Sequence, residues 1–256
     1  MSTARQQHAP FAGLESLNGK VAWVTGAGRG IGRAVAFALA RSGASVALGA
    51  RSTEEIESAA EIITNDGGKA AAIRLDVTDP ANCAAFAAAA TEKLGPVNIL
   101  VNNAGMGIMR PVDKFNDDEF EKQFRVNVFG PYYMVRQALG GLRHNGGGHI
   151  VNVSSLAGEN AAPGGSGYFA TKWALNGFSQ CIFQDLRHDN IKVTIVAPGS
   201  IDTRFHTDSR PGSHEKDQDW MATPEQVANA VLMACMMPDP SMLGKIDVRP
   251  VAKPKK

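Results

Sequence analysis

Apolar residues along this chain follow two alternating patterns. Short runs that are apolar at nearly every position, such as VAWVT and SVALGA, alternate with longer stretches in which apolar residues recur at helical spacing. Continuous short runs are typical of strands buried on both faces, and the longer spacing is typical of helices. The pattern predicts strands at 20–26, 45–50, 69–77, 97–105, 149–155, 191–199 and 245–250. It predicts helices at 31–43, 52–68, 80–95, about 117–143, 168–187 and 224–236.

The regular alternation of strand and helix defines the fold class. Buried strands separated by helices form a parallel sheet, because each crossover returns the chain to the same end of the sheet with a right-handed turn. The sequence therefore predicts an α/β fold: a doubly wound parallel sheet of about seven strands with helices on both faces, a three-layer sandwich. One helix start is specific, since Ser52 followed by Glu55 predicts a capping box.

The 256 residues suit one domain with a substantial core. Residues 1–17 read as a flexible tail without the apolar core of a signal peptide, 18–250 as a single domain, and 251–256 as a short basic tail. The polar, glycine-containing stretch 202–224 is either a substrate lid or an ordinary surface loop.

Charge and cysteine content narrow the functional classes. The net charge of +1 gives no reason to expect nucleic acid or an anionic membrane as a partner, and no apolar run is long enough for a membrane span. The three cysteines are scattered without the spacing of a metal site, so we expect buried, reduced thiols, a cytoplasmic protein and no metal.

A glycine-rich turn follows the first predicted strand, in the stretch TGAGRGIG. Gly26, Gly30 and Gly32 fit the spacing TGxxxGxG. A strand, a glycine turn and a helix N-terminus together form a site for the pyrophosphate of a dinucleotide, because the backbone can approach closely and free N–H groups face the anion. The alternative is that the glycines only tighten the packing of the strand against the helix.

The end of the second predicted strand bears on which dinucleotide would bind. An acidic residue at this place holds the ribose hydroxyls of NAD, but the sequence here is LGARS, with Arg51 and no carboxylate. A guanidinium can pair with the 2′-phosphate of NADP, and Arg29 in the glycine turn is a second candidate. The alternative is two ordinary surface arginines. The pattern favours NADP over NAD.

Tyr168 and Lys172 lie four residues apart, on one face of a predicted helix. A nearby ammonium stabilises phenolate, so we expect Lys172, together with a cationic oxidised nicotinamide, to lower the pKa of Tyr168 and to fit it for proton transfer. Ser154 and Ser155 end the fifth predicted strand, where a hydroxyl can polarise a substrate carbonyl. Taken singly, each motif has an ordinary structural explanation: Tyr168 and Lys172 can be a surface pair, and the serines can simply end the strand.

Together these motifs carry a resemblance. TGxxxGxG, NNAG (102–105), Asn127 in FRVNVFG, Ser155, YFATK (168–172) and PGSIDT (198–203) stand in the order and spacing of the short-chain dehydrogenase/reductase family. The resemblance covers about residues 18–250 and is to the single-domain branch that includes 3-oxoacyl-carrier-protein reductases. The C-terminal sequence MLGKIDVRPVAKPKK departs from the glycine-rich ending of many such reductases, which argues against a carrier-protein substrate.

The resemblance implies a Rossmann-type fold and a role for each motif residue. Four residues would be catalytic. Asn127 would kink the helix and hold a relay water, and Ser155 would orient the carbonyl. Tyr168 would be the acid/base, and Lys172 would bind the nicotinamide ribose. The residues implied to bind the cofactor are Gly26, Arg29, Gly30, Ile31, Arg51, Asp76, Val77, Asn103, Ala104, Gly105, Tyr168, Lys172, Pro198, Gly199, Ile201 and Thr203.

We therefore expect an NADPH-dependent oxidoreductase that interconverts a carbonyl and a secondary alcohol. The alternatives are an NAD-linked dehydrogenase of a sugar, polyol, hydroxy acid or steroid, and a dinucleotide-sensing protein without catalysis. The partners expected are a small-molecule substrate and further copies of the chain. The resemblance implies a homodimer or homotetramer formed by the helices at 117–143 and 168–187.

Overall fold

The structure is a computed structural model that describes residues 14–205, 209 and 220–252. Its strands are β1 (Val21–Thr25), β2 (Ser45–Ala50), β3 (Lys69–Arg74), β4 (Ile99–Asn102), β5 (Gly148–Val153), β6 (Ile191–Pro198) and β7 (Lys245–Val248). Its longer helices are α1 (Gly30–Arg41), α2 (Thr53–Asn65), α3 (Pro80–Leu94), α4 (Asp117–Phe124), α5 (Gly130–His144), α6 (Ser166–Leu186) and α8 (Pro224–Cys235).

All seven strands form one sheet in the order β3-β2-β1-β4-β5-β6-β7, and every neighbouring pair is parallel. The order reverses direction between β1 and β4, the switch point of a doubly wound sheet. The predicted fold class and strand number are therefore confirmed. Chain segments that leave the carboxyl ends of β1, β4, β5 and β6 all emerge at one edge.

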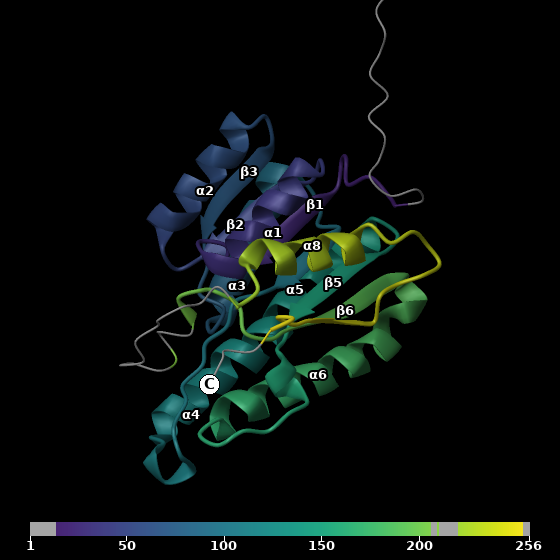
Figure 1. Ribbon diagram of the computed structural model, residues 1–256. Coiled ribbons are helices and arrows are strands. Elements are labelled where there is room, and N and C mark those ends of the chain that lie inside the picture. Colours follow the sequence, from purple (N-terminus) through teal and green to yellow (C-terminus); the bar gives the residue numbers. More distant parts are fainter. Residues whose placement is uncertain (1–13, 206–208, 210–219, 253–256) are drawn as a thin grey trace, which may run out of the picture.

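Two apolar layers enclose the sheet. One joins alternate residues of the strands, such as Val24, to helices α1, α2 and α8; the other joins the opposite faces, including Trp23, to α3, α5 and α6. Figure 1 shows α1 and α8 on one side of the sheet and α6 on the other. Strand β1 is buried at all five positions, which explains why the strands read as continuous apolar runs.

The long helix predicted at 117–143 is not a uniform α-helix. It runs through α4 and α5, but between them Arg125–Phe129 forms a π-helical turn, η2, with Asn127 at its centre. Such a turn widens the helix by one residue and commonly marks a functional position. Asn127 is completely enclosed there. The expected kink at Asn127 thus takes the form of a π turn.

The helix starts show one wrong prediction. Ser52 occupies the N-cap of α2, but its side chain makes no capping hydrogen bond, so the capping box expected with Glu55 does not form. Capping boxes occur instead at Asn116 with Glu119 and at Thr223 with Gln226, while the Asp79 side chain caps α3.

Packing begins before residue 18. The Leu17 side chain is buried in the core, and the Glu15 backbone N–H donates to the Met236 carbonyl over 2.8 Å. Of the three cysteines, Cys83 and Cys235 are buried as expected, but Cys181 is exposed on α6. Within the described part of the chain, no helix has the length and hydropathy needed to cross a membrane.

Candidate active site at the carboxyl edge of the sheet

The glycine turn after β1 has the geometry of an anion site. Gly26 and Gly30 adopt positive φ angles of 66° and 53°, a region that side chains disfavour. Gly32 must lack a side chain, because a Cβ there would meet the Gly26 carbonyl oxygen. Arg29 is the N-cap of α1, but its side chain makes no capping hydrogen bond, and the first turn of the helix contains no acidic residue. The first N–H groups of α1, including that of Ile31, thus receive no capping hydrogen bond from the N-cap side chain and fit a bound phosphate.

Asn103 braces this turn against β4. Its Nδ2 donates to the carbonyl oxygens of Thr25 and Gly26, over 3.0 and 3.2 Å. The Thr25 hydroxyl in return accepts from the backbone N–H groups of Asn103 and Ala104, each over 3.0 Å. The segment predicted to lie beneath a bound ribose is therefore tied directly to the glycine turn.

The adenosine corner lies beside the ends of β2 and β3. Arg51 is exposed just after β2. The Asp76 carboxylate accepts hydrogen bonds from the backbone N–H and hydroxyl of Thr78. Burial opposes ionisation of Asp76, but these hydrogen bonds and the charges of Arg51 and Arg74 outweigh it and lower the pKa of this carboxyl. Val77 is buried next to it.

Tyr168 and Lys172 meet as the sequence predicted. Both are buried on the first turns of α6, and the Lys172 Nζ lies 5.8 Å from the centre of the Tyr168 ring. The same Nζ donates to the Val153 carbonyl at the end of β5, over 3.0 Å. This hydrogen bond ties α6 to the sheet edge where Ser155 emerges.

Ser155 and Ser154 point to different surroundings. The Ser155 hydroxyl accepts from the Ala157 N–H over 3.1 Å and lies 3.4 Å from the Pro198 carbonyl, to which it donates. Ser155 also interacts with the Tyr168 side chain, which lowers the pKa of that phenol. The Ser154 hydroxyl is buried without a hydrogen-bond partner among the described residues. The geometry therefore groups Ser155, and not Ser154, with Tyr168.

The titration behaviour differs from the expectation for a phenol beside an ammonium. Burial raises the pKa of Tyr168 to about 12, and the interaction with Ser155 only partly offsets this. Burial also lowers the pKa of Lys172 to about 8. In the protein without cofactor, removal from water thus outweighs any attraction between the two groups, because both charged forms lose their hydration.

Asn127 fixes the loop that follows β4. Its Oδ1 accepts from the Met106 N–H over 2.9 Å, and its Nδ2 donates to the Met106 carbonyl over 2.8 Å and to the Thr171 hydroxyl over 2.9 Å. Thr171 donates to the Tyr168 carbonyl on the first turn of α6. The π turn thus links the post-β4 loop to the helix that carries Tyr168 and Lys172.

Sequence reasoning missed Gln123, one helical turn before Asn127. This side chain is fully buried, and its Oε1 accepts from the Ile108 N–H over 2.9 Å. Its Nε2 has no partner among the described residues. Gln123 and Asn127 therefore hold Ile108 and Met106, on either side of Gly107. The only feature of the sequence that could have pointed to Gln123 was its position four residues before Asn127, which places the two amide side chains on one face of a helix.

Gly107 and Phe205 form the wall facing Tyr168. The Phe205 and Tyr168 ring centres are 5.4 Å apart, and a Cβ on Gly107 would lie 2.8 Å from Phe205 and 3.3 Å from Tyr168. Sequence reasoning did not single out Phe205. Most of the predicted lid, residues 206–208 and 210–219, lies outside the described residues.

The segment after β6 lies between the glycine turn and Ser155. Pro198 accepts from Ser155, and the Gly199 N–H donates to the Val248 carbonyl over 2.8 Å. Ile201 is buried, and Thr203 stands over the glycine turn, 3.3 Å from where a Cβ on Gly30 would be. The structure thus gathers the predicted nicotinamide residues beside the turn. On the opposite side, a Cβ on Gly105 would lie 3.8 Å from the Lys172 Nζ.

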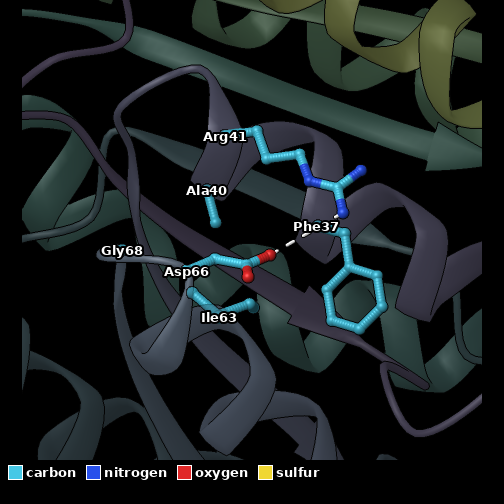
Figure 2. Close-up of a pocket in the computed structure, with 6 residues that line it drawn as sticks. All are labelled: Phe37, Ala40, Arg41, Ile63, Asp66 and Gly68. Atoms are coloured by element: carbon cyan, nitrogen blue, oxygen red, sulfur yellow. Dashed lines mark ion pairs between the residues drawn. The ribbon is translucent and has the colours of Figure 1, made fainter.

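Two hollows differ in their relation to this edge. The larger, about 360 Å³, is mainly apolar and adjoins the start of α6; it is lined by Val112, Ala161, Ala162, Pro163, Gly164, Gly165, Ser166 and Phe169. A small cavity of about 30 Å³ lies between α1 and α2, near the Arg41–Asp66 ion pair shown in Figure 2. It has room for about one water and contains none of the predicted site residues.

Comparison with known proteins identifies the class. The sequence pattern of the family described as short chain dehydrogenase matches residues 20–214. The chain belongs to this family. It is an NAD(P)-dependent oxidoreductase that interconverts alcohols and carbonyl compounds.

Two relatives illustrate the range of the family. The chain is 32% identical over 235 residues to the uncharacterized oxidoreductase MW2403 of Staphylococcus aureus, covering 92% of this chain and 99% of that protein. It is 37% identical over 243 residues to the glycine betaine reductase ATRR of Emericella nidulans, covering 93% of this chain. The match spans only 19% of that longer protein.

Two solved structures share the fold closely. An alcohol dehydrogenase from the archaeon Thermococcus sibiricus, complexed with 5-hydroxy-NADP, has a TM-score of 0.84 and 30% identity, covering 93% of this chain and 99% of that chain. A 7α-hydroxysteroid dehydrogenase complexed with NADH and 7-oxo glycochenodeoxycholic acid has a TM-score of 0.85 and 32% identity, covering 92% and 94%.

Proposed function

We propose that this protein reduces a carbonyl compound to a secondary alcohol with NADPH, and that Tyr168 donates the proton. The observation that carries the proposal is the meeting of Tyr168, Lys172 and Ser155 beside the glycine turn. Bound NADPH would supply a hydride to the carbonyl carbon. The chain's own residues would orient the carbonyl and protonate its oxygen.

Each catalytic side chain has a task that follows from its position. The Ser155 hydroxyl can turn from the Pro198 carbonyl, a long 3.4 Å contact, to donate to a substrate oxygen. Tyr168 is protonated at neutral pH, because burial raises the pKa of its hydroxyl to about 12. It can therefore donate its proton to the developing alkoxide. Asn127 keeps α6 and the post-β4 loop in register through Thr171 and Met106.

Lys172 has a second task in this proposal. Its Nζ already donates to the Val153 carbonyl, and the remaining ammonium protons can reach the ribose hydroxyls of a bound nicotinamide nucleotide. Its positive charge also stabilises any phenolate that forms on Tyr168 during turnover. The uncapped start of α1 and the glycine turn would hold the pyrophosphate.

The preference for NADPH rests on Arg51 and on the residues around it. Arg51 follows β2, where a guanidinium can pair with a 2′-phosphate, and the loop from Gly49 to Ser52 contains no carboxylate. Arg29, at the start of α1, is a second candidate for this contact. A second candidate function, NAD-linked oxidation of a steroid or similar alcohol, is favoured by the likeness to the NADH-bound hydroxysteroid dehydrogenase.

We also propose that copies of the chain assemble into a homodimer or homotetramer through the α4–α5 and α6 helices. Large apolar side chains are exposed on these helices and on the π turn between them: Phe120, Phe129, Tyr132 and Trp173. Burying such aromatic side chains would stabilise an interface.

The test is cofactor oxidation over a panel of ketones, aldehydes, 3-oxo-thioesters and quinones, with NADPH and NADH in parallel. We expect turnover with NADPH, reduced by at least about a hundredfold in Tyr168→Phe, since general acid catalysis contributes about 10² to 10⁴. The variant keeps the ring that packs on Phe205, so its cofactor affinity and melting temperature should match the wild type.

Full activity in Tyr168→Phe would remove Tyr168 from the chemistry. Faster turnover with NADH than with NADPH would favour the second candidate. If NADPH binds but no carbonyl on the panel is reduced, the same variants are compared in the oxidative direction with NADP⁺ and a panel of alcohols.

A further inference from the structure

Glu55 brings a carboxylate to the glycine turn from a neighbouring helix. It lies in the first turn of α2, one helical turn after Arg51. A Cβ placed on Gly28 would lie 2.7 Å from the Glu55 Oε2 and 2.9 Å from the Glu55 Cβ. The side chain is half-buried and therefore packs over Gly28. This contact also explains why Glu55 does not reach back to complete a capping box with Ser52.

The position matters because of what the two flanking segments bind. In this fold the pyrophosphate sits at the glycine turn, and the groups at the end of β2 contact the 2′ position of the adenosine ribose. Glu55 lies on the helix that follows the end of β2, and its side chain approaches Gly28 in the glycine turn. Arg51, four residues earlier, is exposed between the end of β2 and the N-cap of α2. Glu55 therefore adds a carboxylate to a corner that already contains Arg51, Arg74 and Asp76, although the β2 end itself has no carboxylate.

We propose that Glu55 sets the balance between NADH and NADPH by placing a negative charge beside the adenosine 2′ position. This inference rests on the proposed cofactor site. A carboxylate repels the 2′-phosphate of NADPH, and it can accept hydrogen bonds from the free ribose hydroxyls of NADH. Arg51 acts in the opposite direction. The enzyme then accepts both cofactors, with a narrower preference for NADPH than Arg51 alone would give.

The test is a charge series at position 55, measured as the dissociation constants of NADPH and NADH by fluorescence titration without substrate. Glu55→Gln removes the charge and Glu55→Lys reverses it. We expect NADPH binding to tighten by about three- to tenfold in Glu55→Gln, the scale of a partly exposed charge acting on a phosphate. Glu55→Lys should extend the change in the same direction, while NADH binding stays equal or weakens.

Glu54→Gln is the matched control, because Glu54 is the exposed neighbouring residue on the same turn of α2. It should change neither dissociation constant by more than about twofold. Raising the salt concentration should shrink the effect of Glu55→Gln, because salt screens exposed charges. Melting temperatures report whether each variant is folded.

Two failures can be told apart. If the wild-type protein binds neither cofactor, the proposed function fails and this inference fails with it. If the wild type binds both but the ratio of the two dissociation constants is the same in the wild type, Glu55→Gln and Glu55→Lys, only the role of Glu55 is overturned. An equal shift in Glu54→Gln would also overturn it, because the effect would then come from net charge and not from the contact with Gly28.

Discussion

Replacing Lys172 with methionine should stabilise the cofactor-free protein while removing its activity. Burial lowers the pKa of Lys172 from 10.5 to about 8, so the folded state holds this charge at a cost. At about 1.4 kcal/mol per pH unit, the drop corresponds to roughly 3 kcal/mol. Methionine has a similar volume and no charge. It loses the hydrogen bond from the charged ammonium to the Val153 carbonyl, which contributes about 1.5 to 3 kcal/mol.

The net gain is about 1 kcal/mol, or a rise in melting temperature of roughly 2–4 °C for a protein of this size. Its pH dependence identifies the cause. Below pH 8 the lysine is charged in both the folded and unfolded states, so the full free-energy cost of burying its charge lowers the stability of the wild type. As the pH rises from about 8 towards 10.5, the folded protein loses the proton first, and the advantage of methionine shrinks.

The assay is chemical denaturation of Lys172→Met and wild type without cofactor, between pH 6 and pH 9. Lys93→Met on the exposed surface of α3 is the control, and its stability should stay within about 0.5 kcal/mol of the wild type. A destabilised Lys172→Met protein at pH 7 would refute the reasoning. It would mean that the ammonium gains more from its buried contacts than it loses by leaving water.

Two further predictions concern buried polar groups. Burial lowers the pKa of His149 to about 3, so the unfolded state binds the proton first as the pH drops below about 6.5, and stability should fall. The free energy of unfolding, measured by denaturation at pH 7 and pH 5, should decrease by about 2 kcal/mol more in the wild type than in His149→Gln. An equal pH dependence in both proteins would contradict this. In Gln123→Met, the hydrogen bond to the Ile108 N–H is lost, so amide exchange at residues 106–110 should accelerate and the KM for the carbonyl substrate should rise at unchanged NADPH affinity. Unchanged exchange there would show that Gln123 does not hold the loop.

The sequence predicts the architecture well because the strands are buried on both faces. A strand such as β1, enclosed at every position, leaves a continuous apolar run that periodicity detects directly. The π turn at Arg125–Phe129 could not be predicted from periodicity, because its position depends on contacts between Asn127 and the loop at Met106, which is distant in the sequence. The helix pattern alone does not distinguish a π turn from a straight helix.

The site divides along the same line. Tyr168 and Lys172 were predicted from their spacing on one helix, and Ser155 from its place at a strand end together with the family resemblance; the structure brings the three side chains together. The positions of Glu55 and Phe205 were missed because each depends on a contact with a residue far away in the sequence: Gly28 for Glu55, Gly107 and Tyr168 for Phe205. From the sequence alone, a carboxylate in the first turn of a helix predicts a capping box, and only the folded structure shows which residues it faces.

Burial raises the pKa of Tyr168 in the cofactor-free protein, whereas the sequence predicts a lowering by Lys172 and a bound oxidised nicotinamide, and the difference bears on the chemistry. Sequence spacing reveals that Lys172 is near, but it does not reveal how completely both groups leave water. With a pKa of about 12, Tyr168 retains its proton throughout the neutral range, which is the state required to protonate an alkoxide. Oxidation of an alcohol needs the phenolate, which at pH 7 is about 10⁵-fold less populated. In the occupied site, the charges of Lys172 and of an oxidised nicotinamide would favour the phenolate, so the direction of turnover depends on the bound cofactor and not on the cofactor-free site alone.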